Sequence, residues 1–429
     1  MVQAETVYRV AAVCDALGTR ARPGVIAVRE GRVVAAGSAD AVGIDADAVV
    51  VDLPRTLVLP ALVNAHAHLD LTTIGPKPYG GDFAGWLRSV IDQAPVVSHE
   101  GAVRRGVSMS RGSGVACVGD IARSCQGVLA RWSGDGLPGV SYLECVGIGS
   151  GQDAAIGRLT GQLSELMADQ PSRLTGDRDH GLANPRHPVA LGISPHAPYS
   201  AGLDLYGASV RLAESHGYLL TTHLAETLEE VAFVRDGQGP LVDLLRHLGK
   251  WDASMGPTGL HPVEWLEPVL AMKHWLLVHC NHVQDRHIEI LARCQASVAY
   301  CPVASDYFGH HRPDLGRVHR YRDMLDAGVN VCLGTDSILC QRPDDPHPLG
   351  MGSQMRHLYR RDGTDPATIL AMATVNGMRA MGRSPLEASL QPGVVANGVG
   401  VEIDPEDSTE PLVQALAGDQ PMAPLLLTV

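Results

Sequence analysis

The sequence is poor in lysine and has no dense run of basic residues. Its only lysines are Lys77, Lys250 and Lys273, and its 47 acidic residues against 34 basic ones give a formal net charge of −13. Proteins that bind nucleic acids or anionic membranes usually present basic patches. We therefore expect neither nucleic acid nor a membrane as a partner.

Long apolar runs are also missing from the chain. No stretch of about 18 or more apolar residues occurs, so no transmembrane helix is expected. The first residues include Glu5 and Asp15 and no basic segment ahead of an apolar one, which is untypical of a signal peptide. The nine cysteines are odd in number, and several lie in apolar segments. We expect free thiols and a cytoplasmic location.

The remaining composition is that of a large globular chain, with 429 residues of which 45% are hydrophobic and 19% charged. Short β-rich segments alternate with turns in residues 5–55, and residues 392–429 have the same character. These patterns predict a small β-sandwich domain built from both termini, covering residues 1–55 and 385–429.

The middle of the chain, residues 56–384, alternates apolar segments with helical ones. This order is typical of an α/β protein with a (β/α)₈ TIM-type barrel. The eight expected strands lie within residues 56–68, 114–120, 140–147, 189–200, 218–226, 275–283, 296–305 and 329–337. The polar segment 172–187 is expected to be an exposed loop before the fourth strand.

Residues that bind metals follow these expected strands in a fixed order. They are His66, His68, His223, His279 and Asp336. The carboxyl ends of barrel strands meet at one face, so these side chains are expected to converge there. His66 and His68 are two positions apart and therefore point to the same side of a strand. A lone pair of this kind would more often be two surface histidines, but the ordered set of five predicts a metal site.

Acid–base and substrate groups are expected beside this set. Glu226 lies three residues after His223 and is the candidate proton shuttle, although a glutamate in the first helical turn is the simpler alternative. His279 is either a ligand or a group that polarises the substrate. His196, at the end of the fourth strand, and Ser337, after Asp336, are candidate substrate contacts.

The segments that follow strands one, four and seven are expected to choose the substrate. Trp86 and Arg88 lie after strand one, where Arg88 could pair with a carboxylate or a sugar-side polar group; a core Trp and a surface Arg are the alternative. Phe308–His311 combines aromatic and basic residues. His282 is interpreted as structural, and the roles of His310 and His311 stay open.

The shortage of lysine also bears on the number of metal ions. No lysine lies on the fourth strand, so a pair of ions bridged by a carboxylated lysine at that position cannot form. One ion is therefore favoured. Glu144 or Cys145, on the third strand, remains open as an alternative bridging ligand.

These residues resemble the amidohydrolase superfamily over nearly the whole chain, and its mononuclear deaminase and chlorohydrolase branch in particular. The metal motifs are HAH, HLAE, HC and TDS, and the segments FAGWLRSVI, SPHAPYS, LVHCN, VAYCPVASDYFGHH and AGVNVCLGTDS are similar to aminofutalosine deaminase-like and S-adenosylhomocysteine deaminase-like proteins. The chain departs from the pattern at Pro60-Ala61, where Pro-Gly is usual, and at Asn397, where Asp is usual. Neither position is a ligand.

The resemblance implies a specific site and reaction. His66, His68, His223 and Asp336 would hold one divalent transition metal ion, expected to be Zn²⁺, with Fe²⁺ or Mn²⁺ as alternatives. Glu226 would shuttle protons, Asp336 would also act in catalysis, and His279 would orient the water and polarise the substrate.

The implied enzyme is a metal-dependent aminohydrolase that releases ammonia from a small molecule, a purine-type base or nucleoside derivative. Another leaving group, as in triazine dechlorination or cyclic amide opening, is the first alternative. A non-catalytic scaffold is the second, but such a protein would be free to lose ligands that this chain keeps. A homodimer is the expected assembly.

Overall fold

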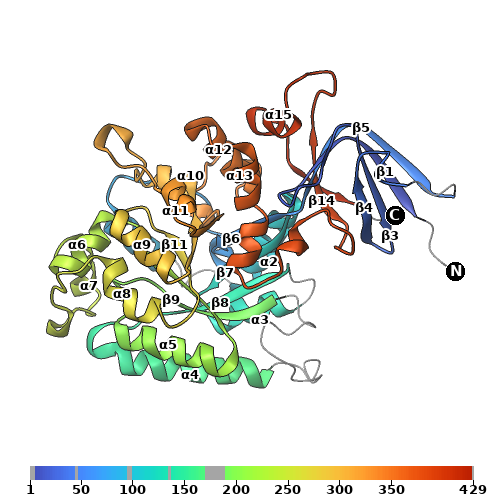
Figure 1. The fold of residues 1–429 in the computed structure, drawn as a ribbon. Helices are drawn as coiled ribbons and strands as arrows, with labels where there is room; N and C mark the ends of the chain where they lie inside the picture. The colour runs from blue at the N-terminus through green and yellow to red at the C-terminus, as the bar shows by residue number, and fades with distance from the viewer. Residues whose placement is uncertain (1–4, 44–46, 94–98, 134–136, 170–188, 428–429) are drawn as a thin grey trace.

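The computed structural model describes residues 5–43, 47–93, 99–133, 137–169 and 189–427. Figure 1 shows a large barrel surrounded by helices and a smaller sheet at its side, next to the N-terminus. The segment 172–187, expected to be a loop, lies outside the described residues.

Eight parallel strands form the barrel, and each overlaps one of the predicted segments. In hydrogen-bonded order they are β6 (Leu62–Ala67), β7 (Val115–Ala122), β8 (Gly139–Cys145), β9 (Val189–Pro195), β10 (Leu219–Leu224), β11 (Leu276–His279), β12 (Ser297–Tyr300) and β13 (Asn330–Leu333). Their residues are buried on both faces, as parallel strands covered by helices require. In β11, for example, Leu276 and Val278 pack in the inner cluster, whereas Leu277 packs outward with the helices. The predicted TIM-type barrel is confirmed.

The barrel closes where the end of β13 meets β6. The backbone N–H groups of Thr335 and Asp336 both donate to the carbonyl of His66, at 3.0 Å each. Gly334 makes this approach possible, because a Cβ atom there would lie only 2.9 Å from the Cβ and carbonyl oxygen of His66. The first and last strands are thereby joined at the carboxyl ends.

Helices follow the strands and cover the barrel (Figure 1). They are α1 (Phe83–Gln93), α2 (His99–Gly112), α3 (Cys125–Trp132), α4 (Gln152–Asp169), α5 (Leu203–His216), α6 (Leu228–Asp236), α7 (Pro240–His247), α8 (Pro262–Leu270), α9 (Asp285–Arg293), α10 (Pro302–Tyr307), α11 (Tyr321–Asp326), α12 (Met351–Asp362), α13 (Pro366–Met372) and α14 (Val375–Ala380). Local capping explains several boundaries: Thr227 accepts from the N–H of Glu230 at the start of α6, and Gly237 ends that helix in the left-handed region. None of the described helices is long and apolar enough to cross a membrane.

The two ends of the chain together form the second unit. Its strands are β1 (Thr6–Cys14), β2 (Arg20–Ala21), β3 (Gly24–Arg29), β4 (Arg32–Gly37), β5 (Val49–Pro60), β14 (Asn397–Glu402) and β15 (Ala423–Leu426), and a short helix, α15 (Pro411–Ala417), joins the last two. The order β15-β14-β5-β1-β3-β4, with β2 beside β1, makes one sheet, which curls in Figure 1. The β domain that was expected from both ends of the chain is therefore present, as one curled sheet.

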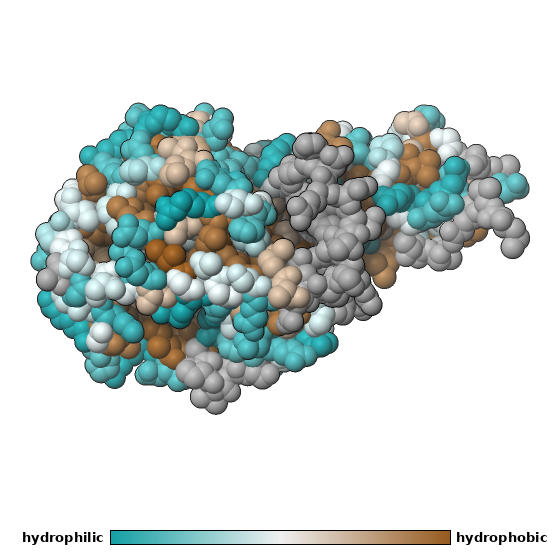
Figure 2. Space-filling model, turned by 90° about the horizontal axis from the view of Figure 1, so that it is seen from below, coloured by the Kyte–Doolittle hydropathy of each residue, from teal (hydrophilic) through white to brown (hydrophobic). Residues whose placement is uncertain are grey.

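One long strand connects the two units. β5 is continuous from Val49 to Pro60 and leads almost directly into β6. The domain limits of 1–55 with 385–429, and of 56–384, therefore stay predictions, because the sheet extends past residue 55. Viewed from below, the molecule has a broad body and a narrower extension, and apolar residues gather in patches among hydrophilic ones on the body (Figure 2).

Candidate active site

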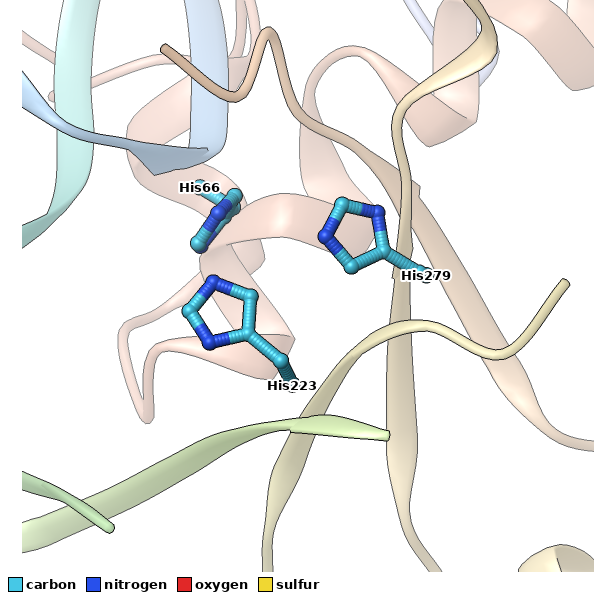
Figure 3. A group of neighbouring side chains, drawn as sticks. All are labelled: His66, His223 and His279. Atoms are coloured by element: carbon cyan, nitrogen blue, oxygen red, sulfur yellow. The ribbon is translucent and has the colours of Figure 1, made fainter. Parts of the chain in front are cut away.

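The predicted metal-binding residues meet at the carboxyl ends of the barrel strands. His66 lies in β6, His223 in β10, and His279 ends β11. Figure 3 shows their imidazole rings converging, with ring centroids 5.0 Å apart for His66 and His223, 5.5 Å for His223 and His279, and 5.8 Å for His66 and His279. All three are buried.

The spacing of the ligand atoms fits a tetrahedral ion. Asp336 Oδ1 lies 3.6 Å from His66 Nε2 and 3.5 Å from His68 Nε2, and the Nε2 atoms of His68 and His223 are 3.3 Å apart. A tetrahedral zinc with bonds of about 2.0–2.1 Å needs ligand atoms about 3.3–3.4 Å apart. The three measured separations, out of the six edges of a tetrahedron, are therefore compatible with one metal ion among these four side chains.

The protonation states of these histidines also suit a metal. His223 donates from Nδ1 to the carbonyl of His196 at 2.9 Å, which leaves the Nε2 lone pair facing the site. The Nε2 atom of His66 is buried without a hydrogen-bond partner. Burial, and then neighbouring histidines, lower the pKa of His66 and His68 well below the usual value and that of His223 to about 4. Neutral imidazole is the form that binds metal.

Two residues that follow Asp336 in the same loop hold its carboxylate in place. Its Oδ1 accepts from the N–H of Ser337 at 2.7 Å, and its Oδ2 from the thiol of Cys340 at 3.4 Å. Its backbone has a φ of 61°, a left-handed conformation that is uncommon outside glycine. The hydrogen bonds to His66 hold it in this conformation and aim the carboxylate at the histidines.

Glu226 lies on the other side of the cluster. Its Oε1 is 3.5 Å from His279 Nε2, and Glu226, His279 and Asp336 offer ligand atoms that all lie within 4.8 Å of one another. Burial, followed by the charge of Asp336, raises the pKa of Glu226 well above its usual value. This buried carboxyl therefore favours its protonated form, as a general acid needs.

The position of Glu226 depends on a second glutamate that sequence reasoning did not single out. Glu230, fully buried, accepts from the backbone N–H groups of Ala225 at 2.7 Å and Glu226 at 3.0 Å. Ala225 has a φ of 49°, so the chain reverses sharply between β10 and α6. The Glu230 carboxylate supplies the partners of this strained turn. The sequence signal was its place three residues after the N-cap, Thr227, where a capping box has its acid.

Another possible group of metal ligands shares His223 with the histidine cluster. Glu144, at the end of β8, offers a ligand atom within 4.8 Å of those of His196 and His223. Burial raises the pKa of Glu144 to about 7. Because His223 already donates from Nδ1 to the His196 carbonyl, a second ion here would compete with that hydrogen bond. Cys145, the other open candidate, belongs to none of the possible ligand groups among the described residues.

A cavity of about 670 Å³ opens above these residues, a size common for small-molecule sites. Its floor includes His68, His223, Glu226, His279 and Asp336. Two helices supply most of its apolar wall, α1 with Phe83, Trp86, Leu87, Val90 and Ile91, and α7 and the residue after it with Leu241, Leu244, Leu245 and Leu248. A flat or extended apolar group therefore fits above the polar floor.

Most of the predicted substrate contacts line this cavity. Trp86, His196, His279 and Ser337 do so. Trp86 is held by donating from Nε1 to Tyr307 Oη at 2.9 Å, and its ring packs edge-on against Phe308 with centroids 4.9 Å apart. Arg88 is the exception: it lies on the exposed face of α1, 3.9 Å from Asp92, and does not line the cavity.

Several lining groups were missed from the sequence. The cations in the wall are Arg123, Arg158 and Lys250. Arg123 is paired with buried Asp70 at 2.8 Å, whereas Arg158 and Lys250 are exposed at the rim. Arg158 lies within α4 and Lys250 lies after the end of α7, both away from strand ends, where no motif marks them. The α7 leucines were missed too, although their helical spacing is readable.

The three histidines without an assigned role lie beside the site. His282 Nε2 is 3.3 Å from His310 Nδ1. His311 is half-buried, and its Nδ1 has no hydrogen-bond partner. Among the described residues, none of the three belongs to a possible metal-ligand group.

We predict about one bound metal ion per chain, and its loss in His66→Ala or Asp336→Ala, because each change removes one of four ligands. Elemental analysis after gel filtration measures it. His216→Ala, a change to an exposed histidine on α5, should keep the metal. A reproducible value near two would contradict a single ion and direct attention to Glu144, which Glu144→Gln would then test.

We predict that Glu230→Gln destabilises the chain by about 1–3 kcal/mol, because an amide NH₂ replaces one acceptor and leaves a buried N–H without a partner. Chemical denaturation of the metal-loaded protein measures the free energy of unfolding. Glu229→Gln, on the preceding residue of α6 with no backbone partner among the described hydrogen bonds, is the control. Equal stabilities of the two variants would remove Glu230 from the support of this turn.

Comparison with known proteins agrees with the geometry. The chain is 26% identical to the 5-methylthioadenosine/S-adenosylhomocysteine deaminase of Symbiobacterium thermophilum, over 89% of this chain and 81% of that protein, and 27% identical to the aminodeoxyfutalosine deaminase of Deinococcus radiodurans, over 86% and 85%. The crystal structure of Helicobacter pylori aminofutalosine deaminase in complex with methylthio-coformycin matches with a TM-score of 0.77 at 19% identity, covering 97% of each chain. Residues 57–422 match the model of the amidohydrolase family, and the chain belongs to that family.

Proposed function

We propose that this protein is a metal-dependent deaminase that releases ammonia from a purine nucleoside derivative. The observation that carries the proposal is the buried carboxyl of Glu226, 3.5 Å from His279 and grouped with Asp336 beside the histidine cluster. A metal site alone would serve many reactions, but a proton donor at this place suits a leaving group that must be protonated.

The proposed metal ligands are His66, His68, His223 and Asp336. Three of their pairwise distances, at 3.3–3.6 Å, support one ion. Three imidazoles and a carboxylate suit Zn²⁺, and also Fe²⁺ or Mn²⁺. When bound, such an ion lowers the pKa of water and so supplies the nucleophile at neutral pH.

The chain's own residues would transfer the protons and orient the substrate. Glu226 holds a proton on its carboxyl and delivers it to the departing nitrogen, while the Asp336 carboxylate accepts one from the water. His279, with Nε2 toward Glu226, orients the water and polarises the ring of the substrate. The apolar walls of α1 and α7 exclude solvent, which strengthens these charge interactions.

The shape of the cavity favours a nucleoside with an extended substituent. The named relatives are deaminases of 5-methylthioadenosine, S-adenosylhomocysteine and aminodeoxyfutalosine. In this chain, Trp86 and Phe308 offer ring faces near the mouth, and the leucines of α7 offer an apolar wall for an arm. A homodimer and a cytoplasmic location stay predictions.

The deciding experiment is an ammonia-release screen on metal-loaded protein. Adenosine, 5′-deoxyadenosine, 5-methylthioadenosine, S-adenosylhomocysteine and aminodeoxyfutalosine are the substrates to compare. Chloride release from a chlorinated triazine and opening of a cyclic amide test the alternative leaving groups. Ammonia from none of the nucleosides would contradict the proposal.

We predict that Glu226→Gln keeps its metal and loses turnover by about 10²–10⁴-fold, because Gln is nearly isosteric but cannot shuttle a proton. Steady-state kcat and elemental analysis on the same samples measure both. Glu229→Gln, three residues further along the chain, is the control and should keep its kcat. A near-normal kcat in Glu226→Gln would remove this residue from the mechanism.

We predict that Arg158→Ala raises KM by about two- to fivefold for S-adenosylhomocysteine, as expected from loss of an exposed ion pair, and leaves KM for 5′-deoxyadenosine unchanged. Arg158 lines the rim of the cavity, where it can meet a carboxylate on the arm. Arg88→Ala is the matched control, because Arg88 faces away from the cavity. The opposite ranking of the two variants would restore Arg88 as the substrate contact.

A further inference from the structure

A second cavity, of about 730 Å³, lies beside the active site. Its walls come from α6, the residue before α8, the segment from β11 into α9, the segment that leads into α11 with the start of that helix, and the last residue of α12. The family comparisons and the proposed reaction assign no role to it.

The lining of this second cavity is rich in arginine and histidine. It contains Arg235, Arg286, Arg317, Arg320 and Arg322, together with His261, His282, His287, His311 and His319, but only two acids, Asp323 and Asp362. This is unusual in a chain with a net charge of −13. Such a concentration of guanidinium groups is typical of sites for phosphate.

Some of these arginines are already paired, and two are not. Arg235 pairs with Asp236 at 2.7 Å, Arg286 with Glu264 at 3.0 Å, and Arg320 with Asp323 at 2.6 Å and also with Asp285. In the described part of the chain, neither Arg317 nor Arg322 forms an ion pair with a carboxylate. Arg322 donates to the carbonyl of Asp362 and lies over the Tyr321 ring, 5.4 Å from its centroid. Both guanidinium groups belong to exposed residues and keep donors for a ligand.

The histidine pair of unassigned role adjoins these charges. His282 lines the cavity, and its ring forms a hydrogen bond with the ring of His310. Burial, and then the charge of Arg317, lower the pKa of His282 to about 4. Arg317 and His282 both line this cavity.

Two buried residues at the bottom of this lining, called its floor below, contact the backbones of Glu226 and His279. Asn281 donates from Nδ2 to the carbonyl of Glu226 at 3.1 Å, and His319 from Nε2 to the carbonyl of His279 at 2.7 Å. Asn281 is 8% exposed and His319 is 7% exposed. Each also has a buried atom without a hydrogen-bond partner, Asn281 Oδ1 and His319 Nδ1.

These unpartnered atoms indicate what the ligand must offer. An amide oxygen only accepts, and a neutral imidazole that donates from Nε2 has an accepting Nδ1. The floor therefore calls for hydroxyl or amino donors, while the arginines at the rim call for an anion. A leftover buried polar atom is costly without such a partner.

We propose that the second cavity binds a small phosphate ester that carries hydroxyl groups, and that its occupancy alters the active site through Asn281 and His319. The phosphate meets Arg317 and Arg322, and the hydroxyls meet the two acceptors of the floor. Binding there shifts the hydrogen bonds that fix the backbones of Glu226 and His279, so the ligand changes kcat.

Isothermal titration calorimetry with ribose 5-phosphate, inorganic phosphate and ribose tests the site on the metal-loaded protein. We expect saturable binding of ribose 5-phosphate, weaker binding of inorganic phosphate, and no heat from ribose. The double variant R317A/R322A should bind ribose 5-phosphate at least about tenfold more weakly, because two charged hydrogen bonds are lost. R312A, a change to an exposed arginine paired with Asp314 outside the cavity, should bind as the wild type does.

Unchanged affinity in R317A/R322A, or equal weakening in R312A, would overturn the site. The coupling is tested by ammonia release at saturating ribose 5-phosphate, which should change kcat in the wild type and leave R317A/R322A unaffected. Binding without any change in kcat would overturn the coupling. Failure of every nucleoside substrate would contradict the proposed function alone, because the calorimetry does not depend on turnover.

Discussion

The closure of the barrel between its last and first strands is the constraint on which the site depends. Thr335 and Asp336 donate to the His66 carbonyl, and Asn64 reinforces this contact by donating to Thr335 Oγ1 at 2.7 Å and accepting from the Thr335 N–H at 3.1 Å. Through it, a carboxylate from the end of the chain's barrel reaches two histidines from its start. A side chain at position 334 would push the two strands apart, so the geometry of the metal site depends on glycine at this position.

Strain is concentrated where the chain leaves the strands that bear the site. Ala225, His279, Cys280 and Asp336 all have positive φ values, and they follow or end β10, β11 and β13. Such conformations cost about 1–3 kcal/mol each for residues other than glycine and persist only where the surroundings hold them. The holding groups are identifiable: Glu230 for Ala225, His319 for His279, and the His66 carbonyl for Asp336. Each returns the backbone sharply and points a functional side chain inward.

The sequence was most informative where a residue's role follows from its place on a strand. A buried parallel strand must be apolar on both faces and must end at the barrel mouth, so the order of the strands and the meeting of His66, His68, His223, His279 and Asp336 could be predicted. Arg88 could not be placed, because one turn of α1 decides whether a side chain faces the cavity or the solvent. The wall from α7, the rim cations and Glu230 depend on how helices pack over the mouth, which local patterns do not specify.

The two cavities differ in where their polar and charged residues lie. The first has a polar floor under apolar walls, so the Asp336 carboxylate and the proton held by Glu226 act in a weakly screening medium. The second has the reverse arrangement, with uncharged acceptors at its floor and guanidinium groups at its rim. They share a thin partition, in which Asn281 and His319 face the second cavity and hold the backbone of the residues that face the first. Ala225, which precedes Glu226, and His279 both have positive φ values, so these two hydrogen bonds lie next to strained backbone, and the proposed coupling between the cavities would pass through them.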